Sequence, residues 1–423
     1  MIRQSNGAVK PCLANVHLIL TRSEEWRGVV ARNEFTGTVV KAQRPPFSAA
    51  AESGDWNDED DARTALWFSQ KGNGGASGLD VHDRLIQQAV LNAADAQRFH
   101  PVRDYLRGLK WDGVPRAGYW LQAYLGAEPT VTTEIGGKSW RDVKAEETYP
   151  GKVGMKFLIG AVARVMRPGC KVDNVMILEG IQGVGKSSVF AVLAQPWFTD
   201  QQIKIGEKDT YEVMRGQWIV ELPELDALSK AEASSAKAFF SRSVDRFRMA
   251  YGRRAASVPR QCVFGGTVNH YQYLQDPSGN RRYLPVRCAR ADLEDLAKDR
   301  DQLWAEAMAL FESGARWWAD SAAERAMFEQ EQDARYVGDA WEPRILRYVQ
   351  GLNSEPSQAP REAVTTGELL QHALGLDPSK WTRAEQIRLG FIMERLRWLR
   401  KREQVGGLRQ WAYFRPAGWE PGS

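Results

Sequence analysis

The chain has 423 residues, 43% of them hydrophobic and 26% charged, and its formal net charge is +4. This composition is typical of a globular protein with two or three domains. No run of about 18 apolar residues is present, so the sequence predicts no membrane span and no membrane partner. Cys12, Cys170, Cys262 and Cys288 are far apart and form no Cys-x-x-Cys pair. We therefore expect neither a zinc site nor a disulfide framework, and we expect a cytoplasmic protein.

Residues 1–130 are predicted to form a small N-terminal α/β and helical region. Its strand-like runs are "VHLIL" at 16–20 and "GTVVKA" at 37–42. Asp60 and Asp61 begin a helical pattern, where carboxylates suit the positive end of the helix dipole. Residues 99–126 are predicted to form two helices joined by a turn at 111–113.

Residues 131–325 are predicted to form the main α/β domain. A polar loop at 133–150 precedes strand-like segments at 175–178, 218–222 and 262–268, and helical patterns separate these segments. Strands that alternate with helices indicate a mainly parallel sheet. A long helix is expected over 300–319.

A glycine-rich motif follows the first of these strands. Gly180, Gly185, Lys186 and Ser187 match the full Gly-x-x-x-x-Gly-Lys-Ser pattern of a P-loop, and the segment 187–194 has a helical pattern. Backbone N–H groups of such a loop surround phosphates, the lysine reaches the β- and γ-phosphates, and the serine hydroxyl binds Mg²⁺. The alternative is a chance glycine-rich turn. The predicted nucleotide-binding residues are Gly180, Gly183, Val184, Gly185, Lys186, Ser187 and Ser188.

Polar residues end the next two predicted strands. Glu221 ends the second strand and Glu224 follows it, and ligands of open α/β sheets bind beyond the carboxyl ends of strands. We expect one acid to bind the metal, with Glu221 preferred alongside Ser187, and the other to orient water. Asp226 better suits a helix cap. Asn269 ends the third strand, where an amide can contact the γ-phosphate or the attacking water.

The ordered motifs resemble those of the virulence-associated protein E family of P-loop ATPases, which phages, prophages and pathogenicity islands carry. The resemblance covers roughly residues 90–320 and rests on "FHPVRDYLRGLKWDGVPR", "RPGCKVDNVMILEGIQGVGKSS", "KDTYEVMRGQWIVELPELDAL", "KAFFSRSVDRFRMAYGRR" and "RQCVFGGTVNHYQYLQDPSGNRRYLPV". The family is similar to the helicase part of phage primase–helicases and lies near the superfamily 3 and AAA+ ATPases.

The resemblance implies an AAA+-like core in a ring, expected to be a hexamer, that binds ATP and Mg²⁺ between subunits. It implies catalytic roles for Lys186, Glu221, Glu224 and Asn269, and an arginine finger at Arg281 or Arg282. We expect one arginine to reach the neighbouring subunit and the other to brace the turn, without deciding between them. The family-like region begins almost at Met1, so any primase is expected to be a separate chain.

Residues 245–260 are predicted to form a basic β-hairpin. The resemblance implies that such a hairpin projects into the pore of the ring. Arg253 and Arg254 would then contact the backbone of single-stranded DNA, and Tyr251 would stack on a base. The alternatives are a solvated basic loop and arginines that face the nucleotide of a neighbouring subunit.

Residues 326–423 are predicted to form a C-terminal winged-helix-like domain. Leu389, Ile392, Leu396 and Leu399 have helical spacing, and the run 406–414 indicates a turn into a strand. Helix, helix and hairpin in this order suit duplex DNA. The alternative is a lid on the ATPase domain or a surface that recruits a partner protein.

Together these features predict an ATP-dependent helicase or translocase that acts on single-stranded and forked DNA during replication of a phage or mobile element. One alternative is a small-molecule kinase with the same P-loop. The other is an ATP-dependent DNA-binding switch, replication initiator or defence component without unwinding activity.

Overall fold

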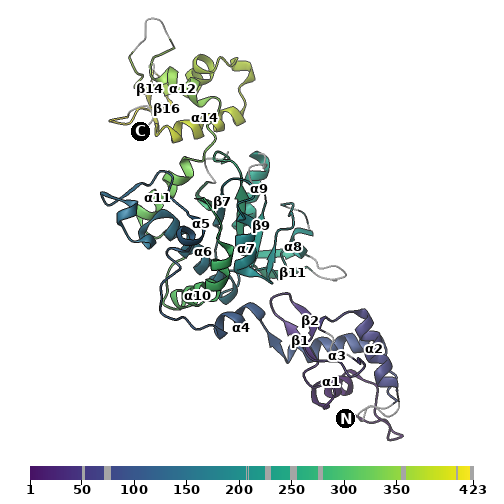
Figure 1. The fold of residues 1–423 in the computed structure, drawn as a ribbon. Coiled ribbons are helices and arrows are strands. Elements are labelled where there is room, and N and C mark those ends of the chain that lie inside the picture. The colour runs from purple at the N-terminus through teal and green to yellow at the C-terminus, as the bar shows by residue number, and fades with distance from the viewer. Residues whose placement is uncertain are drawn as a thin grey trace.

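The structure is a computed structural model that describes residues 1–49, 53–70, 78–205, 207, 209–223, 230–247, 255–274, 280–353, 359–405 and 408–419. These residues form a mixed α/β protein built around a five-stranded sheet. In Figure 1, an N-terminal region and a C-terminal region lie at opposite ends of the part that contains this sheet. Within the described ranges, none of the helices has the length and apolar character needed to cross a membrane.

The N-terminal region packs three helices against a four-stranded sheet of order β3-β2-β1-β4. The strand-like interpretation of residues 16–20 is wrong, because they belong to a helix. Val16, Ile19 and Leu20 are buried on one face of that helix with the i, i+3, i+4 spacing. The elements are α1 (Leu13–Arg22), β1 (Val30–Asn33), β2 (Thr38–Lys41), β3 (Gly54–Asp55), α2 (Asp58–Ser69), α3 (Asp83–Asp95) and β4 (Arg98–Phe99).

The predicted helix pair after β4 is present, and both of its helices pack into the core beside the five-stranded sheet. The stretch predicted as a polar loop contains a two-stranded hairpin and two single turns of 3₁₀-helix before a long buried helix. These elements are α4 (Pro101–Gly108), α5 (Trp120–Leu125), β5 (Glu134–Ile135), β6 (Lys138–Ser139), η1 (Trp140–Asp142), η2 (Ala145–Glu147) and α6 (Tyr149–Met166).

All strand pairs in the five-stranded sheet are parallel, in the order β13-β7-β12-β9-β8. The strands are β7 (Val175–Glu179), β8 (Phe198–Thr199), β9 (Ile219–Leu222), β12 (Val263–Val268) and β13 (Tyr283–Arg287). The predicted parallel sheet and three predicted strands are thus confirmed. Strands β8 and β13 were not predicted, because β8 is two residues long and β13 follows the basic turn directly.

Alternating side chains of β7 enter two different cores. Met176 and Leu178 face a cluster that α6, α7 (Lys186–Ala194) and α10 (Leu293–Glu312) help to form. Val175 and Ile177 face a second cluster, which includes Phe239 of α9 (Lys230–Phe240). A central strand buried on both faces explains its unbroken apolar sequence.

A short helix α8 (Asp209–Val213) precedes β9, and a hairpin of β10 (Val244–Phe247) and β11 (Ala256–Pro259) precedes β12. The antiparallel pairing of β10 with β11 confirms the predicted hairpin strands. After α10, helix α11 (Ala322–Asp333) packs against β13, and Phe328 of this helix is buried in the core. The predicted domain boundary at residue 326 lies inside α11.

The C-terminal region has its own hydrophobic core. Its three-stranded antiparallel sheet has the order β14-β16-β15. The elements are α12 (Glu342–Val349), β14 (Ala363–Thr365), α13 (Thr366–Glu368), the π-helical η5 (Leu369–Ala373), the 3₁₀ turn η6 (Pro378–Lys380), α14 (Arg383–Arg395), β15 (Leu399–Val405) and β16 (Leu408–Phe414).

Candidate functional site at the carboxyl edge of the sheet

The glycine-rich loop connects the carboxyl end of β7 to the first residue of α7. Gly183 and Gly185 adopt φ values of 86° and 96°, a left-handed region that disfavours residues with a side chain. A Cβ atom at Gly180 would lie only 2.9 Å from the Cys288 carbonyl oxygen. The loop therefore needs glycine at these positions, and it directs the N-terminus of α7 at the space beyond the sheet.

Lys186 is the first residue of α7, and its side chain folds back over the loop. Its Nζ donates hydrogen bonds to the carbonyl oxygens of Gly180 at 2.7 Å and Ile181 at 2.9 Å, and to Asn269 Oδ1 at 3.1 Å. The side chain is buried, and this burial lowers the pKa of the ammonium. The three oxygens use all three N–H donors of the lysine and hold its charge at the mouth of the loop.

Glu221 belongs to strand β9 and lies close to Lys186. Its Oε1 accepts hydrogen bonds from the hydroxyls of Ser187 at 2.6 Å and Thr267 at 2.9 Å. Its Oε2 is buried and has no hydrogen-bond partner among the described residues. Burial raises the pKa of this carboxyl group, and the two hydroxyl donors oppose that shift only in part. One carboxylate oxygen is thus available to a ligand.

The predicted site residues differ in how far the structure describes them. Lys186, Ser187, Glu221 and Asn269 come together at the carboxyl edge of the sheet, because β12 pairs with both β7 and β9. Glu224 and Asp226 lie outside the described residues, and so do Tyr251, Arg253 and Arg254. Ser188 belongs to α7, while Val184 belongs to the loop.

Arg281 and Arg282 lie at the opposite edge of the sheet. Tyr283, which follows them, is level with Val175 at the start of β7, whereas Arg287 is level with Glu179 at its end. Four residues of strand span about 13 Å. Arg282 is largely buried and donates from Nε to Ser241 Oγ at 2.9 Å, whereas the side chain of Arg281 is exposed.

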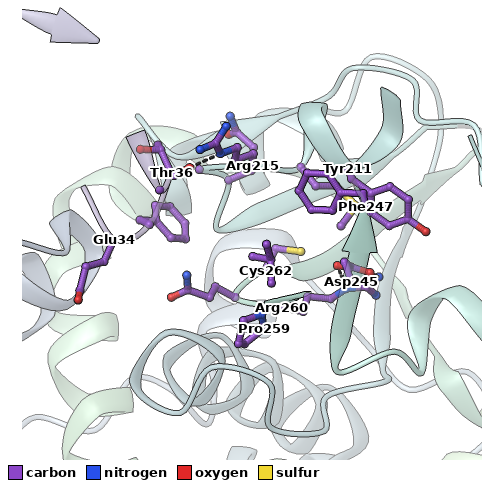
Figure 2. A pocket seen from close by; sticks show the side chains of 16 residues that line it. Glu34, Thr36, Tyr211, Arg215, Asp245, Phe247, Pro259, Arg260 and Cys262 are labelled. Carbon is purple, nitrogen blue, oxygen red and sulfur yellow. Dashed lines mark hydrogen bonds and ion pairs between the residues drawn. The ribbon is translucent and has the colours of Figure 1, made fainter. Parts of the chain in front are cut away.

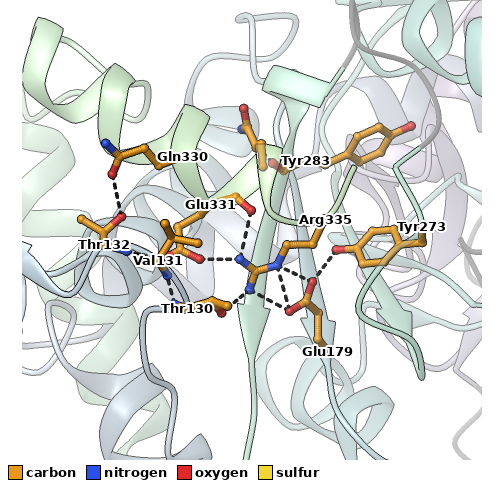
Figure 3. A network of polar contacts seen from close by, with 10 residues as sticks. Thr130, Val131, Thr132, Glu179, Tyr273, Tyr283, Gln330, Glu331 and Arg335 are labelled. Atoms are coloured by element: carbon orange, nitrogen blue, oxygen red, sulfur yellow. Dashed lines mark hydrogen bonds and ion pairs between the residues drawn. The ribbon is translucent and has the colours of Figure 1, made fainter. Parts of the chain in front are cut away.

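A buried ionic network supports the last residue before the loop (Figure 3). The guanidinium of Arg335 donates to both carboxylate oxygens of Glu179, with Nε–Oε1 and Nη2–Oε2 distances of 2.9 Å. Arg335 also pairs with Glu331, and Tyr273 donates its hydroxyl to Glu179 at 2.9 Å. The Glu179 and Glu331 side chains are 0% exposed and that of Arg335 is 3% exposed. Such burial is tolerable because each charge is paired and hydrogen-bonded.

The same network joins distant segments of the chain. Glu331 Oε1 accepts the backbone N–H groups of Thr130, Val131 and Thr132 (Figure 3). Leu274 and Tyr336 form a parallel β-bridge next to Arg335. The residues of this ionic network were not predicted from the sequence. A glutamate at the end of an apolar strand does signal a buried charge, but its partners lie far away in sequence.

The base of the β10–β11 hairpin borders a cavity of about 100 Å³ (Figure 2). Arg260 and Asp245 form a buried ion pair there, with Nη2 2.6 Å from Oδ1. Tyr211 stacks on Phe247, with ring centroids 5.4 Å apart. Arg215 donates to the backbone oxygen of Thr36, so the β1–β2 turn of the N-terminal region lies against this base. The base of the hairpin is thus held by a buried ion pair and a ring stack, and it lies against the N-terminal region.

The fold and the site define an α/β protein in which a glycine-rich loop, a lysine and a buried carboxylate meet at the carboxyl edge of a parallel sheet. Residues 106–337 match the virulence-associated protein E-like domain, and the chain belongs to this family. A search of curated proteins finds no match.

Among solved structures, the chain is similar to the C-terminal region of NrS-1 in its apo A form. One such structure, of residues 305–718, has a TM-score of 0.41 at 9% identity and covers 96% of this chain and 100% of the other. Another has a TM-score of 0.44 at 10% identity and covers 96% and 99%. At this similarity, neither structure assigns a function to the present chain.

We predict that replacing Arg335 by Met destabilises the protein by about 3–5 kcal/mol, because two buried carboxylates lose their partner. Arg335→Lys should lose less, since it keeps the charge but not the planar fork. Urea unfolding followed by tryptophan fluorescence measures both losses. Arg316→Met is the matched control: its ion pair with Asp320 is exposed, so we expect a change within about 0.5 kcal/mol. A loss below about 1 kcal/mol for Arg335→Met would contradict the role of the network.

Proposed function

We propose that the chain is an ATPase that acts as a DNA translocase or helicase in the replication of a phage or mobile element. The observation that carries this proposal is the convergence of Lys186, Ser187, Glu221 and Asn269 beyond the loop between β7 and α7. Helix N-termini and glycine-rich loops of this form favour phosphate groups. In an AAA+-like core, the same arrangement would bind ATP and use Mg²⁺.

The donor set around Glu221 fits Mg²⁺. Mg²⁺ in nucleotide sites is held by one or two carboxylates together with substrate phosphates, and it retains several waters. Glu221 Oε2 is a buried oxygen without a partner in the described part of the chain, and the Ser187 hydroxyl contacts the other oxygen of the same carboxylate. When bound, Mg²⁺ would neutralise phosphate charge.

We propose that side chains of the protein bind the phosphates and orient the attacking water. The Lys186 ammonium exchanges the loop carbonyls for the β- and γ-phosphate oxygens, which carry a full negative charge and attract it more strongly. Asn269 Oδ1 already holds Lys186, so the amide links the lysine to the space where an attacking water would lie. Glu224, which follows β9, is our proposed group for orienting that water.

The position of the two arginines supports an active site shared between subunits. The amino edge of the sheet is too far from Gly180 for an arginine side chain of the same chain to reach, given the register of β13 and β7. Arg282 is held by Ser241, so we assign the bracing role to Arg282 and the trans-acting role to Arg281. An arginine supplied in trans stabilises transition-state charge. This arrangement requires a neighbouring subunit, and we propose that the subunits form a ring, namely a hexamer.

Two features support DNA as the second ligand. Strands β10 and β11 flank, in the sequence, the basic segment that contains Arg253, Arg254 and Tyr251, which we propose to contact single-stranded DNA. The C-terminal region has the order helix, strand, helix, helix, strand, strand, which supports a winged-helix-like domain. Forked DNA and a separate primase are the partners we propose for such a motor.

We predict that the purified protein hydrolyses ATP, that single-stranded DNA stimulates this hydrolysis, and that Lys186→Ala reduces it at least a hundredfold. The loss follows because no other described cation contacts the loop carbonyls. Phosphate release measured with and without DNA, together with strand displacement on a fork, tests the proposal. Phosphorylation of a small molecule without DNA stimulation would favour a kinase. Stimulated hydrolysis without displacement on forks of either polarity would favour a DNA-binding switch.

We predict that Arg281→Ala lowers ATP hydrolysis about a thousandfold and that mixing with Lys186→Ala protein restores part of it. In a randomly mixed ring, about a quarter of the interfaces pair an intact loop with an intact Arg281. The matched control mixes Glu221→Gln with Lys186→Ala. Both changes lie in the same half of the site, so this mixture should stay inactive. If both mixtures stay inactive, Arg281 does not act in trans.

We predict that hydrolysis is lost on acidification at a pH above the ordinary glutamate pKa of 4.5, because burial raises the pKa of Glu221. The proton and Mg²⁺ compete for the same carboxylate, so a higher Mg²⁺ concentration should move the midpoint to lower pH. Initial rates across pH at two Mg²⁺ concentrations measure this shift. The exposed variant Glu312→Gln should behave as wild type. If the pH midpoint of hydrolysis does not change with the Mg²⁺ concentration, Glu221 is not a ligand of Mg²⁺.

A further inference from the structure

A second surface with the chemistry of a nucleic-acid site lies on the β15–β16 hairpin of the C-terminal region, which Figure 1 shows at one end of the molecule. Its exposed cations lie on and directly before the two strands, and the acid among them is Glu403. Within the described residues, no carboxylate forms an ion pair with any of these cations. The cations are Arg397, Arg400, Lys401, Arg402 and Arg409.

Three of these cations share one face of the hairpin with an exposed indole. Arg402 is paired with Trp411 across the strands, and Arg400 lies two residues from Arg402 on the same face. The guanidinium carbon of Arg400 lies 5.0 Å from the Trp411 ring centroid. Trp411 is 53% exposed, although an indole normally buries its large apolar surface. Arg409 is on this face too, since it pairs with Gln404.

The backbone before the hairpin is held in an unfavourable conformation. Arg397 follows α14 with a φ of 62°, where a glycine is the usual residue. A side chain in this left-handed region strains the backbone. An exposed arginine kept at such a position, next to four other cations, points to a function for its charge.

A groove of about 640 Å³ continues this face toward α14. Its walls include Ile387, Phe391 and Leu399, which are 49%, 39% and 48% exposed, and the rim includes Arg400. Gly390 and the buried Tyr413 also line this groove.

We infer that this face binds single-stranded nucleic acid, with Trp411 as a stacking platform and Arg400, Arg402 and Arg409 as phosphate contacts. Unpaired bases expose their flat faces and stack on aromatic rings, whereas a duplex offers only base edges to polar side chains. Ile387 and Phe391, on the exposed side of α14, cannot read base edges by hydrogen bonding. The inference rests on the proposal that DNA is a ligand of this protein, but it needs neither ATP nor the ring.

The test measures binding of a fluorescein-labelled oligothymidylate by fluorescence anisotropy, without nucleotide. The protein is the full chain with Tyr251→Ala, Arg253→Ala and Arg254→Ala, so that the contacts proposed for the β10–β11 segment are removed. Adding Trp411→Ala should weaken binding about tenfold or more. Adding Arg402→Ala or Arg409→Ala should reduce the slope of log affinity against log salt by about 0.7.

The matched control is Trp318→Ala. Trp318 is 45% exposed and contacts Arg316 by a similar cation–π pair, but it lies in the segment between α10 and α11. This variant should bind as the parent does. Circular dichroism melting shows whether each variant is folded, and Trp411→Phe, which keeps a ring, should retain most of the affinity.

Three results would overturn the inference: unchanged affinity in folded Trp411→Ala, tighter binding of the matching duplex than of the single strand, or displacement of the oligonucleotide by polyglutamate at equal charge. The last result would instead identify an acidic protein segment as the ligand. Absence of ATP hydrolysis would refute the proposed function, yet it would leave this binding experiment unaffected.

Discussion

Strand β12 pairs in parallel with β7 on one side and with β9 on the other, and the geometry of the site depends on this pairing. Parallel strands end at the same edge of a sheet, so polar residues from three distant segments of the chain meet there. Lys186 contacts Asn269 at the end of the adjacent strand β12, and Ser187 contacts Glu221 of β9, one strand further along the sheet. A shift in the register of β12 would separate both pairs.

Parallel pairing also keeps the glycine-rich loop after β7 apart from the turn before β13. It places the turn before β13 at the amino edge, so the loop and the Arg281 turn of one chain face opposite ways. The buried network around Arg335 holds both ends of this arrangement. It binds Glu179 directly before the loop, and through the Leu274–Tyr336 bridge it fixes the segment that leads toward the turn. Buried ionic groups of this kind are costly to disrupt, so the network holds the end of β7 next to the Leu274–Tyr336 bridge.

The two candidate nucleic-acid surfaces differ in how the fold supports them. The β10–β11 hairpin rests on the buried Arg260–Asp245 pair and on the N-terminal β1–β2 turn, so its base is tied to the main sheet. The β15–β16 hairpin belongs to a region with a separate hydrophobic core. The first hairpin is thus joined to the part of the chain that carries the candidate site, whereas the second belongs to a different core.

The sequence by itself determined the loop, the three central strands, the hairpin strands and the identity of the residues that gather at the site, because each has a local pattern. Glycine spacing, apolar runs and a polar residue at a strand end are local signals. The prediction of a strand at residues 16–20 was wrong, since a short run of mostly apolar residues fits a strand as well as a helix. Only the tertiary structure decided the partners of Glu179, the place of β13 and the difference in burial between Arg281 and Arg282. Those outcomes depend on strand order and on contacts between residues far apart in the chain, such as Arg335 with Glu179, which no local pattern encodes.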